Sequence, residues 1–272
     1  NNIQWAKQLE KSGVHVVYGI IGLKTHTKIA LVIRKETNGL RSYFHIGTGN
    51  YNSKTSNRYT DLGLLSSETE LGQDLVELFN YLTGFSKQQR FRKLLVAPVS
   101  LRKGIESLIK KEIQHSKAGR KGKICAKMNS LVDPGIINLL YEASQAGVEI
   151  KLIIRGMCCL YPQVKNLSEN IKVISVIGRF LEHSRIFWFL NNDNPEVFIG
   201  SADWMRRNLD RRVEAVTPIQ NPELKKEIEK ILEIYLNDTS NAWEMTSTGK
   251  FNKRKADMKE NCAQLQLIEE RK

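Results

Sequence analysis

Long apolar runs and a secretion signal are both missing from this sequence. No apolar run approaches the roughly 20 residues that a membrane-spanning helix needs, so we expect no transmembrane segment. No signal peptide precedes the first helical pattern. The chain starts at Asn1 without a methionine and runs directly into that pattern, so we expect a fragment of a longer protein.

Cysteine is scarce, and its spacing matches no common metal-binding motif. The four cysteines are Cys125, the adjacent Cys158 and Cys159, and Cys262, with no CxxC pair and no histidine at zinc-finger distance. We interpret them as reduced side chains that fill space in the fold. Reduced cysteines favour a cytoplasmic protein, and peripheral association with a membrane is left open.

Acidic residues are too few to balance the basic ones. The chain has 42 Lys and Arg against 29 Asp and Glu, a formal net charge of +13. A field of this sign concentrates polyanions, which predicts an anionic partner. The lysine-rich segment 101–123 is better interpreted as the solvated face of a helix. With 41% hydrophobic residues, the 272-residue chain can bury one large core or two smaller ones.

The sequence does contain a repeated pattern around two histidines. His26 has Lys28 two positions later, and His183 has Arg185 two positions later. Each unit follows a helical pattern, a glycine and an alternating apolar segment, and each is followed by a glycine-rich loop. In an extended strand, positions i and i+2 face the same side, so each histidine is predicted to open a strand beside a cation that can hold a phosphate. The two loops are 47–50 and 200–203.

Alternating helix and strand patterns predict an α/β fold with mixed sheets flanked by helices. We predict two halves, 1–92 and 93–240, with the active site between them, and a charged, disordered tail over 241–272, where apolar periodicity is weak. The predicted helices are 3–11, 70–82, 101–114, 135–145 and 222–236. The predicted strands are 14–20, 28–34, 40–46, 94–97, 123–127, 149–154, 172–176, 186–189, 197–199 and 213–217.

The context of each histidine separates candidates for catalysis from structural residues. His15, His45 and His115 lie in alternating strands or on a charged helix and are interpreted as structural. His26 and His183 are candidates for chemistry, because a neutral imidazole is populated near pH 7 and can attack phosphorus. A phosphohistidine keeps a high-energy P–N bond, which suits reversible transfer better than hydrolysis.

Other residues are suited to holding phosphate. The glycines of the loop that ends at Asn50 lack Cβ atoms, so its backbone N–H groups are predicted to point at phosphate oxygens. Arg155 ends an apolar strand pattern, and Arg212 closes an arginine-rich run. Both guanidinium groups can bind phosphate in a bidentate way.

Seven strings in this order also carry a family resemblance: GLKTHTKIALV, HIGTGNYN, YTDLGL, KMNSLVD, LSENI, GRFLEHSRIF and GSADWMRRNLDRRVE. Over about residues 1–218 the chain closely resembles the C-terminal part of bacterial polyphosphate kinase of the first type, a member of the phospholipase D-like superfamily. The resemblance implies two phospholipase D-like α/β halves. It implies reversible transfer of the ATP γ-phosphate to inorganic polyphosphate, with ATP or ADP and Mg²⁺ as cofactors. It also implies a homo-oligomeric whole protein without specific nucleic-acid binding.

The same resemblance implies roles for individual residues. It places the autophosphorylated histidine at His26 and a second active-site histidine, a general acid that also contacts phosphate, at His183. It implies no metal ligand within this chain, because the family's metal-site arginines and adenine-holding helical regions would lie upstream of it. The expected ATP- and phosphate-binding residues besides His183 are Tyr59, Arg155, Arg212, Lys28, Asn50 and Arg185.

Two other classes of function stay open at this point. Phospholipase D-type phosphodiesterases carry HxKxxxxD, but the positions of the Asp here hold Ile33 and Leu190, which favours the kinase. A nuclease or phosphodiesterase would use the same two histidines with water as the acceptor. A non-catalytic polyanion-binding domain would need the arginines but not His26.

Overall fold

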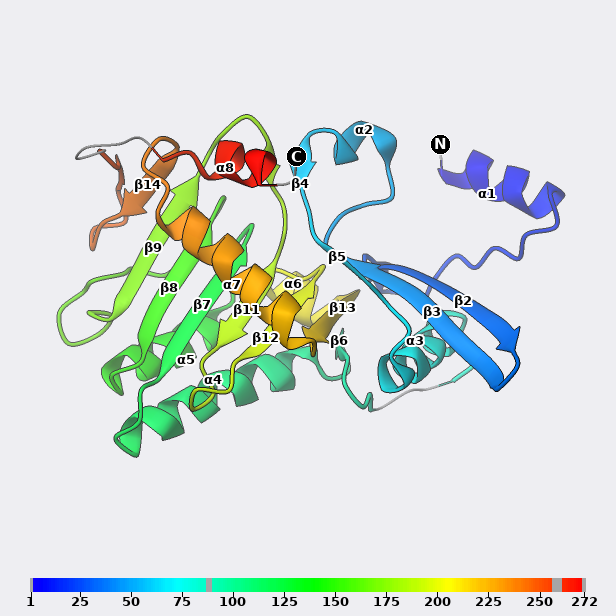
Figure 1. Ribbon diagram of the computed structural model, residues 1–272, viewed down its shortest axis with the longest axis horizontal. Helices are drawn as coiled ribbons and strands as arrows, with labels where there is room; N and C mark the ends of the chain where they lie inside the picture. The colour runs from blue at the N-terminus through cyan, green and yellow to red at the C-terminus, as the bar shows by residue number, and fades with distance from the viewer. Residues whose placement is uncertain (1, 87–89, 256–260, 271–272) are drawn as a thin grey trace.

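The computed structural model describes residues 2–86, 90–255 and 261–270 (Figure 1). Within these residues the largest sheet has ten strands, in the order β1-β13-β12-β11-β7-β8-β9-β14-β15 with β6 on β13. Parallel and antiparallel pairs both occur in it. Its strands are β1 (Lys24–Thr25), β6 (Leu95–Ala97), β7 (Lys123–Met128), β8 (Glu149–Ile154), β9 (Ile171–Val176), β11 (Ile186–Phe189), β12 (Glu196–Gly200), β13 (Arg212–Ile219), β14 (Ala242–Met245) and β15 (Phe251–Lys253).

Two smaller sheets accompany the large one. An antiparallel sheet has the order β2-β3-β5, and a two-residue parallel pair joins β4 to β10. Their bounds are β2 (Lys28–Glu36), β3 (Gly39–Gly47), β5 (Gly63–Ser66), β4 (Tyr59–Thr60) and β10 (Leu181–Glu182). The helices are α1 (Asn2–Lys11), α2 (Ser53–Ser56), α3 (Thr69–Leu82), α4 (Leu101–Lys117), α5 (Pro134–Gln145), α6 (Arg206–Asp210), α7 (Pro222–Leu236) and α8 (Ala263–Glu269).

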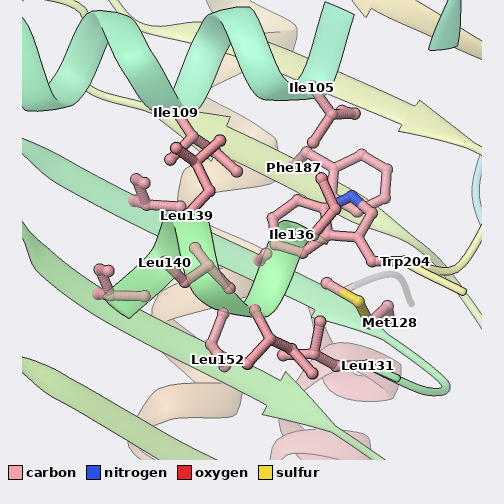
Figure 2. Close-up of a cluster of buried hydrophobic side chains, with 14 of the residues drawn as sticks. Ile105, Ile109, Met128, Leu131, Ile136, Leu139, Leu140, Leu152, Phe187 and Trp204 are labelled. Carbon is pink, nitrogen blue, oxygen red and sulfur yellow. The ribbon is translucent and has the colours of Figure 1, made fainter. Parts of the chain in front are cut away.

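Both faces of the large sheet are covered, which explains its continuous apolar strands. On one face Ile105 and Ile109 of α4 and Leu140 of α5 pack toward Phe187, whose ring stacks on Trp204 at 5.2 Å (Figure 2). On the other face, α7 and α8 pack over a second cluster of buried residues. The expected α/β class, with mixed sheets flanked by helices, is confirmed.

Capping residues account for helices whose bounds the sequence predicted closely. Helix α7 has the predicted bounds, because Asn221 caps its first turn and Pro222 occupies its first position. Helix α5 begins in the same way, since the Asp133 side chain accepts the Ile136 N–H at 3.0 Å. Among the described residues, no helix has both the length and the apolar character needed to cross a membrane.

Two expectations about local structure are wrong. Residues 14–20 form no strand, because Val14, Val17 and Tyr18 are exposed and their alternation faces no packed layer. The tail is ordered where it is described: β14 pairs with β9 and with β15, and α8 contacts α7. The edge of β9 opposite β8 supplies hydrogen-bonding groups that β14 uses, and apolar periodicity does not reveal such an edge. Residues 256–260 and 271–272 of the predicted tail lie outside the described residues.

Candidate active site

Two short parallel pairings place the histidines. Strand β1 pairs with β13 and ends directly before His26, whose N–H donates to the Val213 carbonyl at 2.9 Å. Strand β4 pairs with β10, which ends directly before His183, and the His183 N–H donates to the Thr60 carbonyl at 3.2 Å. Each histidine therefore lies in the connection before a longer strand, and the prediction that it opens that strand is wrong by two or three residues.

His26 is oriented by a buried carboxylate. Its Nδ1 lies 2.9 Å from Oε2 of Glu214, a fully buried residue of β13 that also accepts a hydrogen bond from the Ser201 hydroxyl. The His26 side chain is 22% exposed, and its Nε2 has no hydrogen-bond partner among the described residues. With Nδ1–H donating to Glu214, the lone pair of His26 lies on Nε2 and is free to react.

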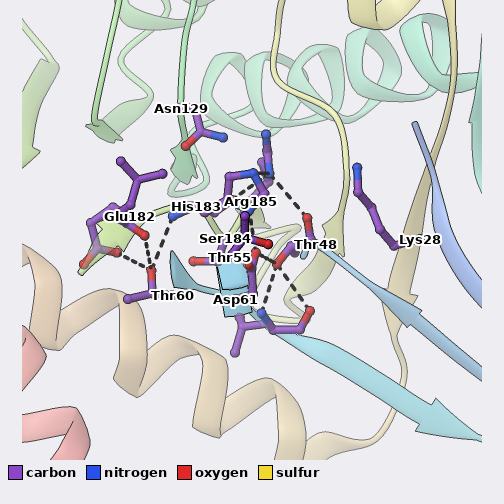
Figure 3. A network of polar contacts seen from close by, with 12 residues as sticks. Lys28, Thr48, Thr55, Thr60, Asp61, Asn129, Glu182, His183, Ser184 and Arg185 are labelled. Carbon is purple, nitrogen blue, oxygen red and sulfur yellow. Dashed lines mark hydrogen bonds and ion pairs between the residues drawn. The ribbon is translucent and has the colours of Figure 1, made fainter. Parts of the chain in front are cut away.

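His183 has a matching partner from the other half of the chain. Its Nδ1 lies 2.8 Å from Oδ1 of Asp61, which also accepts from the Thr48 hydroxyl at 2.6 Å (Figure 3). Its Nε2 accepts from Arg185 Nη1 at 3.1 Å. Burial lowers the pKa of His183, and Arg185 lowers it further against the opposing effect of Asp61. The imidazole is therefore neutral near pH 7.

The carboxylates of these two pairs were missed by reasoning from the sequence. Asp61 follows Thr48 of the first glycine-rich loop by 13 residues, and Glu214 follows Ser201 of the second loop by the same 13. In both cases the hydroxyl donates to the carboxylate. This repeated spacing was the available signal. Histidine spacing alone could not show that each carboxylate serves the histidine of the opposite half.

The cations beside the histidines are buried and held in place. Lys28 Nζ donates to the carbonyl of His26. Burial lowers the pKa of Lys28 to about 8, with Glu214 opposing and Arg185 and Arg212 reinforcing the change. Arg185 donates through Nε and Nη2 to the two carboxylate oxygens of Asp203, each at 3.3 Å. A guanidinium fixed in this way is preorganised for an anion.

The other residues predicted to bind ATP or phosphate differ in how closely they contact the two histidine–carboxylate pairs. Arg155 Nε donates to the Glu182 carbonyl at 2.8 Å, and Arg212 Nη1 lies 3.7 Å from Oε1 of Glu214. The Tyr59 ring is tilted by 45° against the His183 ring, with centroids 5.0 Å apart. Asn50 is exposed on its loop. Within the described part of the chain, no side-chain hydrogen bond joins Asn50 to the other candidates.

The first glycine-rich loop supports a carboxylate, and one of its N–H groups is not free for a phosphate. The Thr48 N–H is already used, since it donates to the Leu62 carbonyl at 2.9 Å. A Cβ atom at Gly49 would lie 2.4 Å from the carboxylate of Asp61. Glycine is therefore needed at position 49 to let Asp61 approach His183.

No group of three or more His, Cys, Asp or Glu side chains able to hold a metal ion occurs among the described residues. The carboxylates at the site are already engaged by histidines, hydroxyls and arginines. The residues present therefore do not fit a protein-held Mg²⁺ ion.

The fold and site define an α/β protein with two crossed histidine–carboxylate pairs, and comparisons with known proteins identify its family. The model of polyphosphate kinase C-terminal domain 1 matches residues 1–88, and that of C-terminal domain 2 matches residues 94–265. The chain therefore belongs to the polyphosphate kinase family. The domain 2 match includes part of the predicted tail, in agreement with the ordered β14 and α8.

Individual relatives agree with this family. A polyphosphate kinase of Prochlorococcus marinus is 71% identical over 98% of this chain and 38% of its own length. One from Dictyostelium discoideum is 50% identical over 96% of this chain and 25% of its own length. The crystal structure of polyphosphate kinase from Porphyromonas gingivalis matches with a TM-score of 0.93 and 39% identity, over 99% of this chain and 42% of that one. The chain thus spans less than half the length of these relatives.

Proposed function

We propose that this chain is the catalytic part of an enzyme that reversibly transfers the γ-phosphate of ATP to inorganic polyphosphate through a phosphohistidine at His26. The observation that carries the proposal is the orientation of His26. Its Nδ1 is bound to buried Glu214, and its Nε2 is unpartnered among the described residues beside buried cations. This arrangement supports a nucleophilic imidazole with a defined tautomer.

In the first step, His26 Nε2 attacks the γ-phosphorus in line. The Nε2–P bond forms while the bond from phosphorus to the bridging β,γ-oxygen breaks, and its electron pair leaves with ADP. The Nδ1–H donated to Glu214 lets that carboxylate stabilise the positive charge that develops on the ring. Charge on the phosphoryl oxygens is neutralised by Lys28, Arg155, Arg185 and Arg212.

His183 acts on the leaving side. Its imidazole is neutral in the free site because burial lowers its pKa. A bound polyphosphate group adds negative charge, which favours the protonated form, and His183 then donates a proton to the leaving oxygen. Asp61 holds the ring throughout. The Tyr59 ring, next to His183, contacts the nucleotide.

The second step returns the phosphoryl group to a polyphosphate chain. A terminal oxygen of polyphosphate attacks the phosphorus, the Nε2–P bond breaks, and the electron pair returns to His26. The P–N bond is close in energy to a phosphoanhydride, so the sequence of steps runs in both directions. The Mg²⁺ that the family resemblance implies would accompany the nucleotide, where it would neutralise charge on the phosphates.

The test uses the chain together with the upstream region that its relatives carry, here called the extended protein. Incubation with γ-labelled ATP is expected to give acid-labile, base-stable label on the protein and a long-chain product. A hydrolytic phosphodiesterase would pass the group to water and give no chain, and a binding domain would give neither. An active protein with equal label after His26→Ala would contradict the phosphohistidine.

A further inference from the structure

The buried carboxylate of Glu182, next to His183, accepts hydrogen bonds from several segments of the chain. Glu182 is 3% exposed and accepts from Lys127 Nζ at 2.8 Å and from the Thr60 hydroxyl at 2.8 Å. It also accepts from Gln264 Nε2 at 2.6 Å, and the Tyr235 hydroxyl bonds to it as well. Burial alone would raise the pKa of Glu182, but Lys127 and the other donors hold it below its usual value. Glu182 is therefore ionised.

The hydrogen bond between Glu182 and Thr60 lies directly beside the His183–Asp61 pair, because each of its residues is the chain neighbour of one member of that pair. Glu182 is the last residue of β10 and directly precedes His183. Thr60 is the last residue of β4 and directly precedes Asp61 (Figure 3). Strands of two residues share few backbone hydrogen bonds, so the side-chain network around Glu182 sets much of their relative position.

Gln264 is the member of the network that comes from the C-terminal segment. Its side chain is 4% exposed, and its amide bonds to both backbone groups of Phe180: Oε1 accepts the N–H at 3.0 Å and Nε2 donates to the carbonyl at 2.9 Å. Gly178 makes room for it, since a Cβ there would lie 2.6 Å from Gln264 Oε1. The amide thus holds the segment leading into β10 at Phe180 and at Glu182.

Packing around this network is incomplete on one side. A cavity of about 250 Å³ separates α7 and α8 from the β4 and β10 segments. Its walls include Tyr59, Asp61, Phe180, Ile231, Gln264 and Leu267. Since a cavity provides no van der Waals contacts, hydrogen bonds restrain the strand pair on this side.

We propose that Gln264 is a positioning residue for the His183–Asp61 pair, an inference that rests on the proposed function. It acts through Glu182 and Phe180 and touches no substrate. Displacement of a catalytic group by about an ångström can cost on the order of 10²-fold in rate. Loss of the amide should therefore lower kcat about 10- to 100-fold and leave the KM for ATP within about twofold.

The test compares Q264M with Q266M in the extended protein. Methionine keeps the volume of glutamine without its amide. Gln266 is the matched control, because it lies on the same helix and its side chain bonds to Glu270 at 3.1 Å. Q264M should lower kcat as stated, and Q266M should not. Parental kcat in Q264M would overturn the inference.

A second comparison separates positioning from general stabilisation. In the His183→Ala background, Q264M should cause no further loss, because the group that it positions is gone. An equal loss in both backgrounds would show a merely structural role and overturn the inference. If Q264M does not fold, Q264E replaces it under the same criteria, since it keeps the acceptor for the Phe180 N–H and loses both donated bonds.

A readout independent of turnover keeps this inference separate from the proposed function. Histidine ring NMR of the chain should show His183 titrating below its ordinary pKa of 6.5, and Q264M should move the pKa back toward that value. Q266M should leave it unchanged. If the His183 pKa is unchanged in Q264M, the positioning role is overturned, even if the extended protein makes no polyphosphate. If the His183 pKa shifts in Q264M but the extended protein transfers no phosphoryl group, only the proposed function is contradicted.

Discussion

His26 Nδ1 lies 2.9 Å from Glu214 Oε2, although the two residues are 188 positions apart in the sequence. His183 and Asp61 form the reciprocal contact at 2.8 Å across 122 positions. Each half therefore supplies one histidine and the carboxylate that orients the histidine of the other half. Neither half forms a complete pair alone, and both contacts depend on β1 and β4 pairing with strands of the second half.

The Glu214 contact predicts that the tautomer of His26 controls labelling. Glu214→Gln in the extended protein should slow phosphohistidine formation by roughly 10² to 10⁴, because an amide neither fixes the Nδ1–H as firmly nor stabilises the developing charge. His26→Ala should abolish both label and polyphosphate. Rapid-quench labelling measures these rates, with Glu223→Gln at an exposed position as the control. Parental labelling by Glu214→Gln would contradict the assigned role.

His183→Ala should slow the reaction without removing the nucleophile. A general acid is typically worth roughly 10² to 10⁴ in rate, so the label on His26 should still form, but slowly. The loss should shrink with an ATP analogue that has a better leaving group. Comparing burst rates for ATP and the analogue checks this. A mutant that labels at the parental rate would exclude His183 from the first transfer.

Polyphosphate binding should weaken as the pH rises through about 8. Burial lowers the pKa of Lys28 to about 8, so the ammonium that attracts the anion is present below that pH and lost above it. Titrating labelled polyphosphate at several pH values and constant ionic strength measures the effect. Lys28→Arg should remove this pH dependence, because a guanidinium stays charged. Equal pH dependence in both proteins would assign it to another group.

Asp74 should be important for stability at the junction of the two domains. Its buried carboxylate accepts the N–H groups of Arg92, Lys93 and Leu94 at 2.9, 2.7 and 2.9 Å. Asp74→Ala leaves these donors without their partner and should lower the free energy of unfolding by about 2–4 kcal/mol. Urea unfolding measures the loss, with Glu70→Ala on the exposed side of α3 as the control. Equal stability of the two variants would refute the prediction.

The chain by itself should bind polyphosphate but make little or none from ATP. Binding needs the cations, whereas turnover needs the nucleotide placed to within about an ångström, and this chain spans 38% of the length of its Prochlorococcus relative. The logarithm of affinity should fall roughly linearly with the logarithm of salt concentration, by analogy with counterion release from nucleic acids. Turnover equal to that of the extended protein, or binding independent of salt, would contradict the prediction.

Local sequence patterns predicted many of the elements and the candidate reactive residues. The bounds of α7 and β8 agree with those predicted, because caps and apolar periodicity act over neighbouring residues. The repeated histidine and cation pairs could be found for the same reason. Residues 14–20 show the limit of this reasoning, since an alternating pattern forms a strand only where another strand accepts its hydrogen bonds.

Only the tertiary structure decided which groups meet. The C-terminal segment is ordered because β14 pairs with the edge of β9. Gln264 contacts Glu182, which lies 82 positions earlier in the sequence. The pairing of His26 with Glu214 depends on β1 joining β13, a contact that no local pattern specifies. Side-chain type and spacing show what chemistry a residue can perform. Its contact partners depend on strand pairings and packing between distant segments, and these follow from the folding of the whole chain.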